Sequence, residues 1–148
     1  MEVTKENIIW IFVLGIDSFA LLANVVGVFV IFIAEFKSHQ SIVLFSLTVA
    51  EMIGVITGMI DVVTQEIDAI PINTELLSGI DVLAGIELLL MMVILTIDRL
   101  IYFVRPEKYS QIMSVMKTKV IIVLSWLISI IIAILYVKLA LLAWLLVS

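Results

Sequence analysis

Charged side chains within apolar segments are the residues of this sequence best suited to chemistry. Asp98 and Arg99 are adjacent at the end of "LLLMMVILTIDRL", Glu51 lies inside another apolar segment, and Asp81 precedes Arg99 by eighteen residues. An ionised side chain in hydrocarbon costs at least a few kcal/mol unless it has a partner. These residues therefore predict ion pairs, hydrogen bonds between helices, or recognition of a charged ligand.

The sequence contains no arrangement of residues that is typical of an enzyme. The 148 residues include no cysteine and one histidine, His39, in the polar stretch "EFKSHQ", where we expect a solvated loop side chain. No nucleophile with a base, no zinc spacing and no phosphate-binding glycine loop is present. The prediction is a protein that is not an enzyme and does not bind nucleic acid.

The composition is that of a membrane protein. Hydrophobic residues make up 64% of the chain and charged residues only 14%, whereas soluble domains are about half apolar and a quarter charged. Apolar segments over 8–34, 41–60, 77–104 and 120–137 are long enough to cross a bilayer. Spanning segments form helices because their backbone groups have no water to bond. The fold class predicted is an all-α membrane protein with four transmembrane helices in a single domain.

The connections between the spans are less regular. Residues 61–75, "DVVTQEIDAIPINTE", include Pro71 and several acids and are predicted to be a loop. One helix from Val120 to Ser148 would be about 42 Å long, which exceeds the hydrocarbon thickness. We therefore predict a break near Tyr136 and Lys138, with 139–148 starting a partial fifth span.

The basic residues orient the chain. Six of the eight lie in or beside the connections 1–2 and 3–4, whereas the connection between spans two and three has four acids and no base. By the positive-inside rule, the N-terminus is predicted to be outside the cell. The localisation predicted is a multi-pass protein of the plasma membrane. The six are Lys37, Arg99, Arg105, Lys108, Lys117 and Lys119.

The polar landmarks of all four spans resemble those of the rhodopsin-like (class A) G-protein-coupled receptors. The third helix of that family ends in Asp-Arg-Tyr followed by Pro-x-x-Tyr in the next loop, and "DRLIYFVRPEKY" keeps this spacing, with leucine at the motif tyrosine. "LANVV" has the asparagine of the first helix, "LTVAEM" has glutamate for the aspartate of the second, and the tryptophan of the fourth is also present. The matching residues are Asp98, Arg99, Pro106, Tyr109, Asn24, Glu51 and Trp126.

The resemblance implies roles for these residues. Asp98, Arg99, Asn24 and Glu51 would form the activation switch, in which Asp98 holds Arg99 until activation. Pro106 and Tyr109 would lie in the loop that faces a heterotrimeric G protein, and Trp126 would be structural. The alternative for Arg99 is an anchor that extends its guanidinium to the membrane surface.

The resemblance also implies a ligand site and a cofactor. Asp81 and Arg99 are five helical turns apart, on one face and separated by about 27 Å. In amine receptors an aspartate at this spacing pairs with the ligand's ammonium; the alternative is a hydrated acid near a loop. "KYSQIMSVMKTK" is similar instead to melanocortin receptors, whose ligand-side acids are matched by Asp61, with Thr74 and Ser78 at the other positions. The resemblance therefore implies a small amine or a peptide as the ligand.

Glu51 is the residue at which a cofactor, a sodium ion, would be expected. The resemblance implies sodium at this residue, although Leu88 replaces the serine that usually helps to bind the ion. Asn24 would hydrogen-bond to Glu51. The alternative is a glutamic acid bonded between helices, without an ion. Asp17 and Glu87 are likewise expected to make polar contacts between helices.

The family has seven helices and the resemblance covers the first four, so we expect receptor signalling to be incomplete in this chain. The alternative function is a four-span structural or interaction protein, a receptor fragment or scaffold that assembles with other helices or with itself in the lipid bilayer. A transporter subunit is less favoured because no basic residue lies in the middle of a span.

Overall fold

The structure, a computed structural model, describes residues 5–33, 38–66 and 74–147, and in them it has helices and no strand. The four long helices are α1 (Lys5–Ile33), α2 (His39–Glu66), α3 (Thr74–Val104) and α5 (Val115–Val147). A one-turn 3₁₀ helix, η1 (Pro106–Lys108), and the short α4 (Tyr109–Ile112) connect α3 to α5. Each long helix contains a segment apolar and long enough to cross a membrane, which confirms the all-α, four-span prediction.

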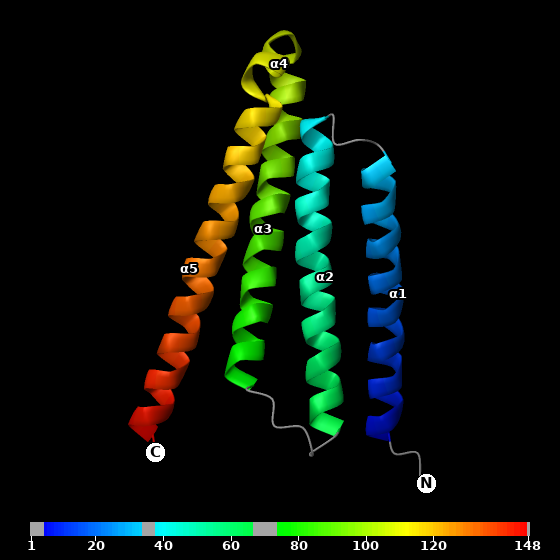
Figure 1. The fold of residues 1–148 in the computed structure, drawn as a ribbon, viewed down its shortest axis with the longest axis vertical. Helices are drawn as coiled ribbons and strands as arrows, with labels where there is room; N and C mark the ends of the chain where they lie inside the picture. Colours follow the sequence, from blue (N-terminus) through cyan, green and yellow to red (C-terminus); the bar gives the residue numbers. More distant parts are fainter. Residues whose placement is uncertain (1–4, 34–37, 67–73, 148) are drawn as a thin grey trace.

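The four long helices run up and down beside one another (Figure 1). α1 packs against α2, α2 against α3, and α5 against both α3 and α2. α1 begins and α5 ends at the same end of the bundle, and η1 and α4 lie at the other end (Figure 1). We call these two ends the open end and the loop end.

The turn at the loop end follows from Pro106. Proline fixes its own φ and disfavours helix at the residue before it, and Arg105 has φ −141° and ψ 65°, outside the helical region. The amide of Arg105 still bonds the carbonyl of Ile101, which closes α3. The chain then reverses through η1 and α4 into α5, which brings Tyr109 back beside the end of α3.

Two predicted boundaries were wrong. α2 continues to Glu66, so residues 61–66 are helical and not a loop; the buried Val62 and the bond from Thr64 Oγ1 to the Asp61 carbonyl belong to this last turn. The rest of the predicted loop, up to residue 73, lies outside the described residues.

The other wrong boundary is the break near Tyr136 and Lys138. α5 passes through this region without interruption, and residues 139–147 continue it and do not start a fifth span. No glycine or proline is present to end the helix. Two contacts with α3 also hold this part in place: Tyr136 Oη lies 3.3 Å from Ser78 Oγ, and Val137 packs against Gly79.

Gly79 permits a close approach of α3 to α5. A methyl group at this position would lie 2.5 Å from Cγ2 of Val137, whereas at Gly85, on the same helix, it would meet nothing within 4 Å. We therefore expect Gly79→Ala to lower the free energy of unfolding by about 1–3 kcal/mol. Gly85→Ala, the matched control, should be neutral or stabilising by about 0.5–1 kcal/mol. Unfolding by detergent titration in bicelles measures both, and equal values would contradict the close contact.

Candidate functional site

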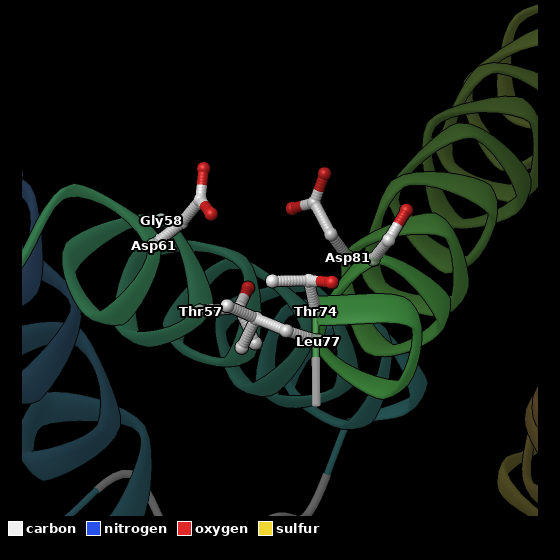
Figure 2. A pocket seen from close by; sticks show the side chains of 7 residues that line it. Thr57, Gly58, Asp61, Thr74, Leu77 and Asp81 are labelled. Carbon is white, nitrogen blue, oxygen red and sulfur yellow. The ribbon is translucent and has the colours of Figure 1, made fainter. Parts of the chain in front are cut away.

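Two acids that are far apart in the sequence face one cavity near the open end. Asp61 comes from the last turns of α2 and Asp81 from the second turn of α3, and both line a cavity of about 290 Å³. Figure 2 shows their carboxylates on neighbouring helices, pointing to the same side. The structure therefore brings together both residues that the sequence predicts for ligand contact.

The lining of this cavity is acidic and polar. Hydroxyl groups of Thr57, Thr74 and Ser78 share it with the two carboxylates, and no basic residue lines it. Thr57 Oγ1 donates to the carbonyls of its own helix, 3.0 Å from Ile53 and 2.9 Å from Gly54, so its oxygen lone pairs remain available as acceptors. A site with these groups favours a cationic ligand that donates hydrogen bonds.

A second group of oxygens lies deeper in the bundle, between α1, α2 and α3. Asp17, Asn24 and Glu51 line one cavity of about 440 Å³ together with Leu88. All three polar residues are half-buried, and the predicted hydrogen bond between Asn24 and Glu51 does not occur among the described residues. Oxygen donors from three residues are the kind of ligand that a small hard cation uses, while Leu88 contributes none.

Glu87 is fully buried between α3 and α5. It is 0% exposed, and its two carboxyl oxygens each meet a serine of α5: Ser125 Oγ at 2.8 Å and Ser129 Oγ at 2.9 Å. The spacing of the two serines, i and i+4, puts both hydroxyls on one helix face. The predicted polar contact between helices is confirmed for Glu87, and both oxygens of its carboxyl group are satisfied.

Trp126 links α5 to α2. Its indole Nε1 donates to Ser46 Oγ at 2.8 Å, and its ring packs against a buried cluster of Val43, Met91 and Ile122. These contacts join three helices at one point, consistent with the structural role predicted for Trp126.

At the loop end, Asp98 is the centre of a polar cluster that also contains His39, Gln40 and Tyr109; we call it the Asp98 cluster. Tyr109 Oη donates to Asp98 Oδ1 at 2.7 Å, and His39 Nε2 lies 3.2 Å from the same oxygen. His39 Nε2 is also 2.5 Å from Tyr109 Oη, which accepts from Gln40 Nε2 at 3.3 Å. The cluster joins the start of α2, the end of α3 and α4.

The Asp98 carboxylate is costly to bury and depends on this cluster. Asp98 is 2% exposed, and its Oδ2 is buried with no hydrogen-bond partner. The neighbouring Arg99 is exposed and forms no ion pair with Asp98 among the described residues, so the predicted Asp98–Arg99 pair does not occur in the structure. Pro106, in η1, is exposed as well. Burial raises the pKa of the Tyr109 phenol above its ordinary value, and the hydrogen bond to Asp98 acts in the same direction, so the phenol remains a donor at neutral pH.

His39 corrects a prediction. It is half-buried at the first residue of α2 and bonded within the Asp98 cluster, and is not a solvated loop side chain. The sequence indicated Asp98 and Tyr109 but not His39, whose partner lies 70 residues later. The only signal in the sequence was the position of His39 just before an apolar span, at the same side of the membrane as the connection between spans three and four.

No protein-family model matches the chain, and the search of curated proteins found no match. Candidate roles for these residues therefore depend on their geometry and on the ordered landmarks in the sequence.

Proposed function

We propose that the chain is the ligand-sensing, four-helix portion of a rhodopsin-like G-protein-coupled receptor. In this proposal, the Asp61–Asp81 cavity binds a ligand that carries a protonated amine, either a small amine or a basic group of a peptide. The Asp98 cluster, Arg99 and the loop with Pro106 and Tyr109 form the cytoplasmic side, which faces a heterotrimeric G protein once three further helices complete the bundle. The membrane would be the plasma membrane, with the N-terminus outside.

The observation that carries the proposal is the shared cavity of Asp61 and Asp81. Two carboxylates and several hydroxyls without a base form a site whose charge an ammonium group would neutralise. The cavity lies at the end of α3 opposite Asp98, so one helix connects the proposed ligand site to the proposed output site. A change at one end that tilts or shifts α3 would act directly on the other.

The Asp98 cluster supports the output half of the proposal. A carboxylate that is buried at a helix end and held by groups of two other elements is a contact that a shift of α3 would break. Arg99, exposed beside it, is available to a cytoplasmic partner. In the activation switch implied by the family resemblance, the aspartate is released when the G protein binds, and in this chain the contacts that would break are those of Asp98 with Tyr109 and His39.

Ligand binding is testable with arylalkylamines. We expect 2-phenylethylamine or tryptamine to raise the unfolding temperature of the purified chain in micelles, because binding to the folded state alone stabilises it. The neutral analogue 2-phenylethanol, which has the same ring and lacks the ammonium, should give no shift. A basic peptide serves as the second probe class.

Isosteric variants of the acids distinguish binding in this cavity from nonspecific binding of the amine elsewhere on the protein. Asp81→Asn should abolish the shift, and Asp61→Asn should reduce it, while Glu75→Gln, an acid at the same end of α3 that does not line the cavity, should leave it unchanged. Equal shifts with the amine and the alcohol, or a full shift in Asp81→Asn, would refute the proposed ligand site.

The second candidate, a structural or interaction protein, is favoured by α1. No residue of the apolar segment Ile9–Ile33 of α1 is buried. Large apolar side chains such as Phe12, Phe19 and Phe29 are 69%, 73% and 66% exposed. Such a helix has wide surfaces for packing against other transmembrane helices as well as against lipid. Assembly with other helices would also give Asp17 and Glu51, which face an open cavity, further polar partners.

A further inference from the structure

We propose that a groove between α3 and α5 near the open end binds an anionic phospholipid. One acyl chain would fill the groove, and the phosphate would pair with Lys138. This inference does not depend on the proposed receptor function, because the groove and the Asp61–Asp81 cavity are lined by different residues of α3.

The groove is apolar and open on its side. It has a volume of about 350 Å³, and apart from Lys138 its walls are apolar: Leu76, Ile80, Leu83, Ile130, Ala133 and Ile134 are among them. Leu76 and Ile134 are 59% and 51% exposed, so the groove opens away from the bundle. A groove on the flank of membrane-spanning helices opens into the bilayer, where acyl chains are the surrounding solvent.

The floor of the groove is fixed by the contact of Gly79 with Val137. The absent side chain at Gly79 lets α5 approach α3 closely. The hydrogen bond between Ser78 and Tyr136, one residue earlier in each helix, joins the two helices at the same depth. Larger side chains on both sides of this contact then project past it and form two walls. The groove is thus part of the packing of α3 on α5.

Lys138 gives the groove its charge preference. It lies inside the apolar segment Val115–Ala143, it is exposed, and it is the only charged residue that lines the groove. Nine more helical residues follow it in α5, all of them apolar. No carboxylate of the described residues lies within ion-pair distance of its ammonium. An anionic headgroup would therefore meet this ammonium without a competing carboxylate among the described residues.

The depth of Lys138 fits a lipid phosphate. Asp81 and Arg99 mark a distance of about 27 Å along α3, close to the hydrocarbon thickness of a bilayer. Through the contact of Val137 with Gly79, Lys138 is at the level of the Asp81 end, where hydrocarbon gives way to headgroups.

Native mass spectrometry of the full chain in detergent tests the proposal. The probes are phosphatidylglycerol and phosphatidylcholine with identical acyl chains, added in equal amounts. One favourable charge pair at the membrane surface predicts about a fivefold preference for phosphatidylglycerol. Lys138→Gln should abolish this preference, whereas Lys119→Gln, an exposed lysine at the loop end of α5, should retain it.

Two tryptophan variants test the groove itself. Ile134→Trp fills the groove and should reduce binding of phosphatidylglycerol, while Leu135→Trp, at the same depth on the next exposed position, should not. The proposal is overturned by equal binding of both lipids to the wild type, by equal behaviour of the paired variants, by displacement of the bound phospholipid by an equimolar amount of oleate, or by a dimer that Ile134→Trp dissociates. These outcomes indicate bulk lipid, unspecific binding, a fatty-acid site and a self-interface, respectively.

Discussion

The double variant Ser125→Ala with Ser129→Ala is expected to be less stable than the wild type by about 2–5 kcal/mol. The two hydroxyls are the partners of the Glu87 carboxyl group, at 2.8 and 2.9 Å, and Glu87 is 0% exposed. Their removal leaves a buried polar group without hydrogen bonds between α3 and α5. The free energy of unfolding in bicelles, from detergent titration, gives the size of the effect.

The stronger test adds Glu87→Met to this double variant. Removing the carboxyl group together with both hydroxyls leaves apolar groups of similar size, and such replacements are often close to neutral. We therefore expect the triple variant to recover most of the lost stability, although it differs from the wild type at one more position. A triple variant as unstable as the double would show that the serines contribute by packing alone.

A matched serine provides the control. Ser18 is exposed on α1 and bonds only the Leu14 carbonyl of its own helix, so Ser18→Ala should change stability by less than about 0.5 kcal/mol. The comparison separates the loss of a hydroxyl as such from the loss of a partner for Glu87.

The helices were predictable from sequence because apolar length alone requires them. Segments of this length have to satisfy their backbone bonds internally, and all four appear in the structure. Their ends were less predictable. Residues 61–66 include acids that are typical of a loop, but they are helical. α5 continues past Lys138, and there it contacts Gly79 and Ser78 of α3. Contacts with another helix cannot be identified from the sequence of α5 itself.

The candidate site was predictable where it depends on helical register. Asp61 and Asp81 share a cavity because neighbouring antiparallel helices bring the end of one beside the start of the next. The partners of Glu87 follow the i, i+4 rule once α5 is known to face α3. Partners across a turn were not predictable: His39 and Tyr109 meet only because the chain reverses after Pro106, and no periodicity encodes that approach.

The combination of His39→Ala with Tyr109→Phe is expected to have the second large effect, a loss of about 3–5 kcal/mol in stability. Asp98 is 2% exposed, and its Oδ1 lies 2.7 Å from Tyr109 Oη and 3.2 Å from His39 Nε2. Both contacts disappear in this variant, and since Oδ2 has no partner already, the carboxylate is left buried without hydrogen bonds from the cluster. Unfolding in bicelles measures the loss, and amide hydrogen exchange over residues 107–112 should show faster opening of η1 and α4.

Two controls define what the Asp98 cluster contributes. Tyr102 is exposed, and the centroid of its ring lies 5.2 Å from that of Tyr109. Tyr102→Phe removes only the hydroxyl of this ring, and it should change neither stability nor hydrogen exchange. Asp98→Asn in the background of the double variant removes the charge and should restore part of the stability, because a neutral amide costs less to bury than a carboxylate.

The raised pKa of Tyr109 means that its hydrogen bond to Asp98 is present below its ordinary pKa of 10.0 and is lost only as the pH rises above that value. The difference between wild type and Tyr109→Phe should therefore be present throughout the neutral range and disappear only at alkaline pH. If this difference instead vanished near neutral pH, or if Asp98→Asn restored nothing, the stability of the loop end would not depend on the burial of this carboxylate.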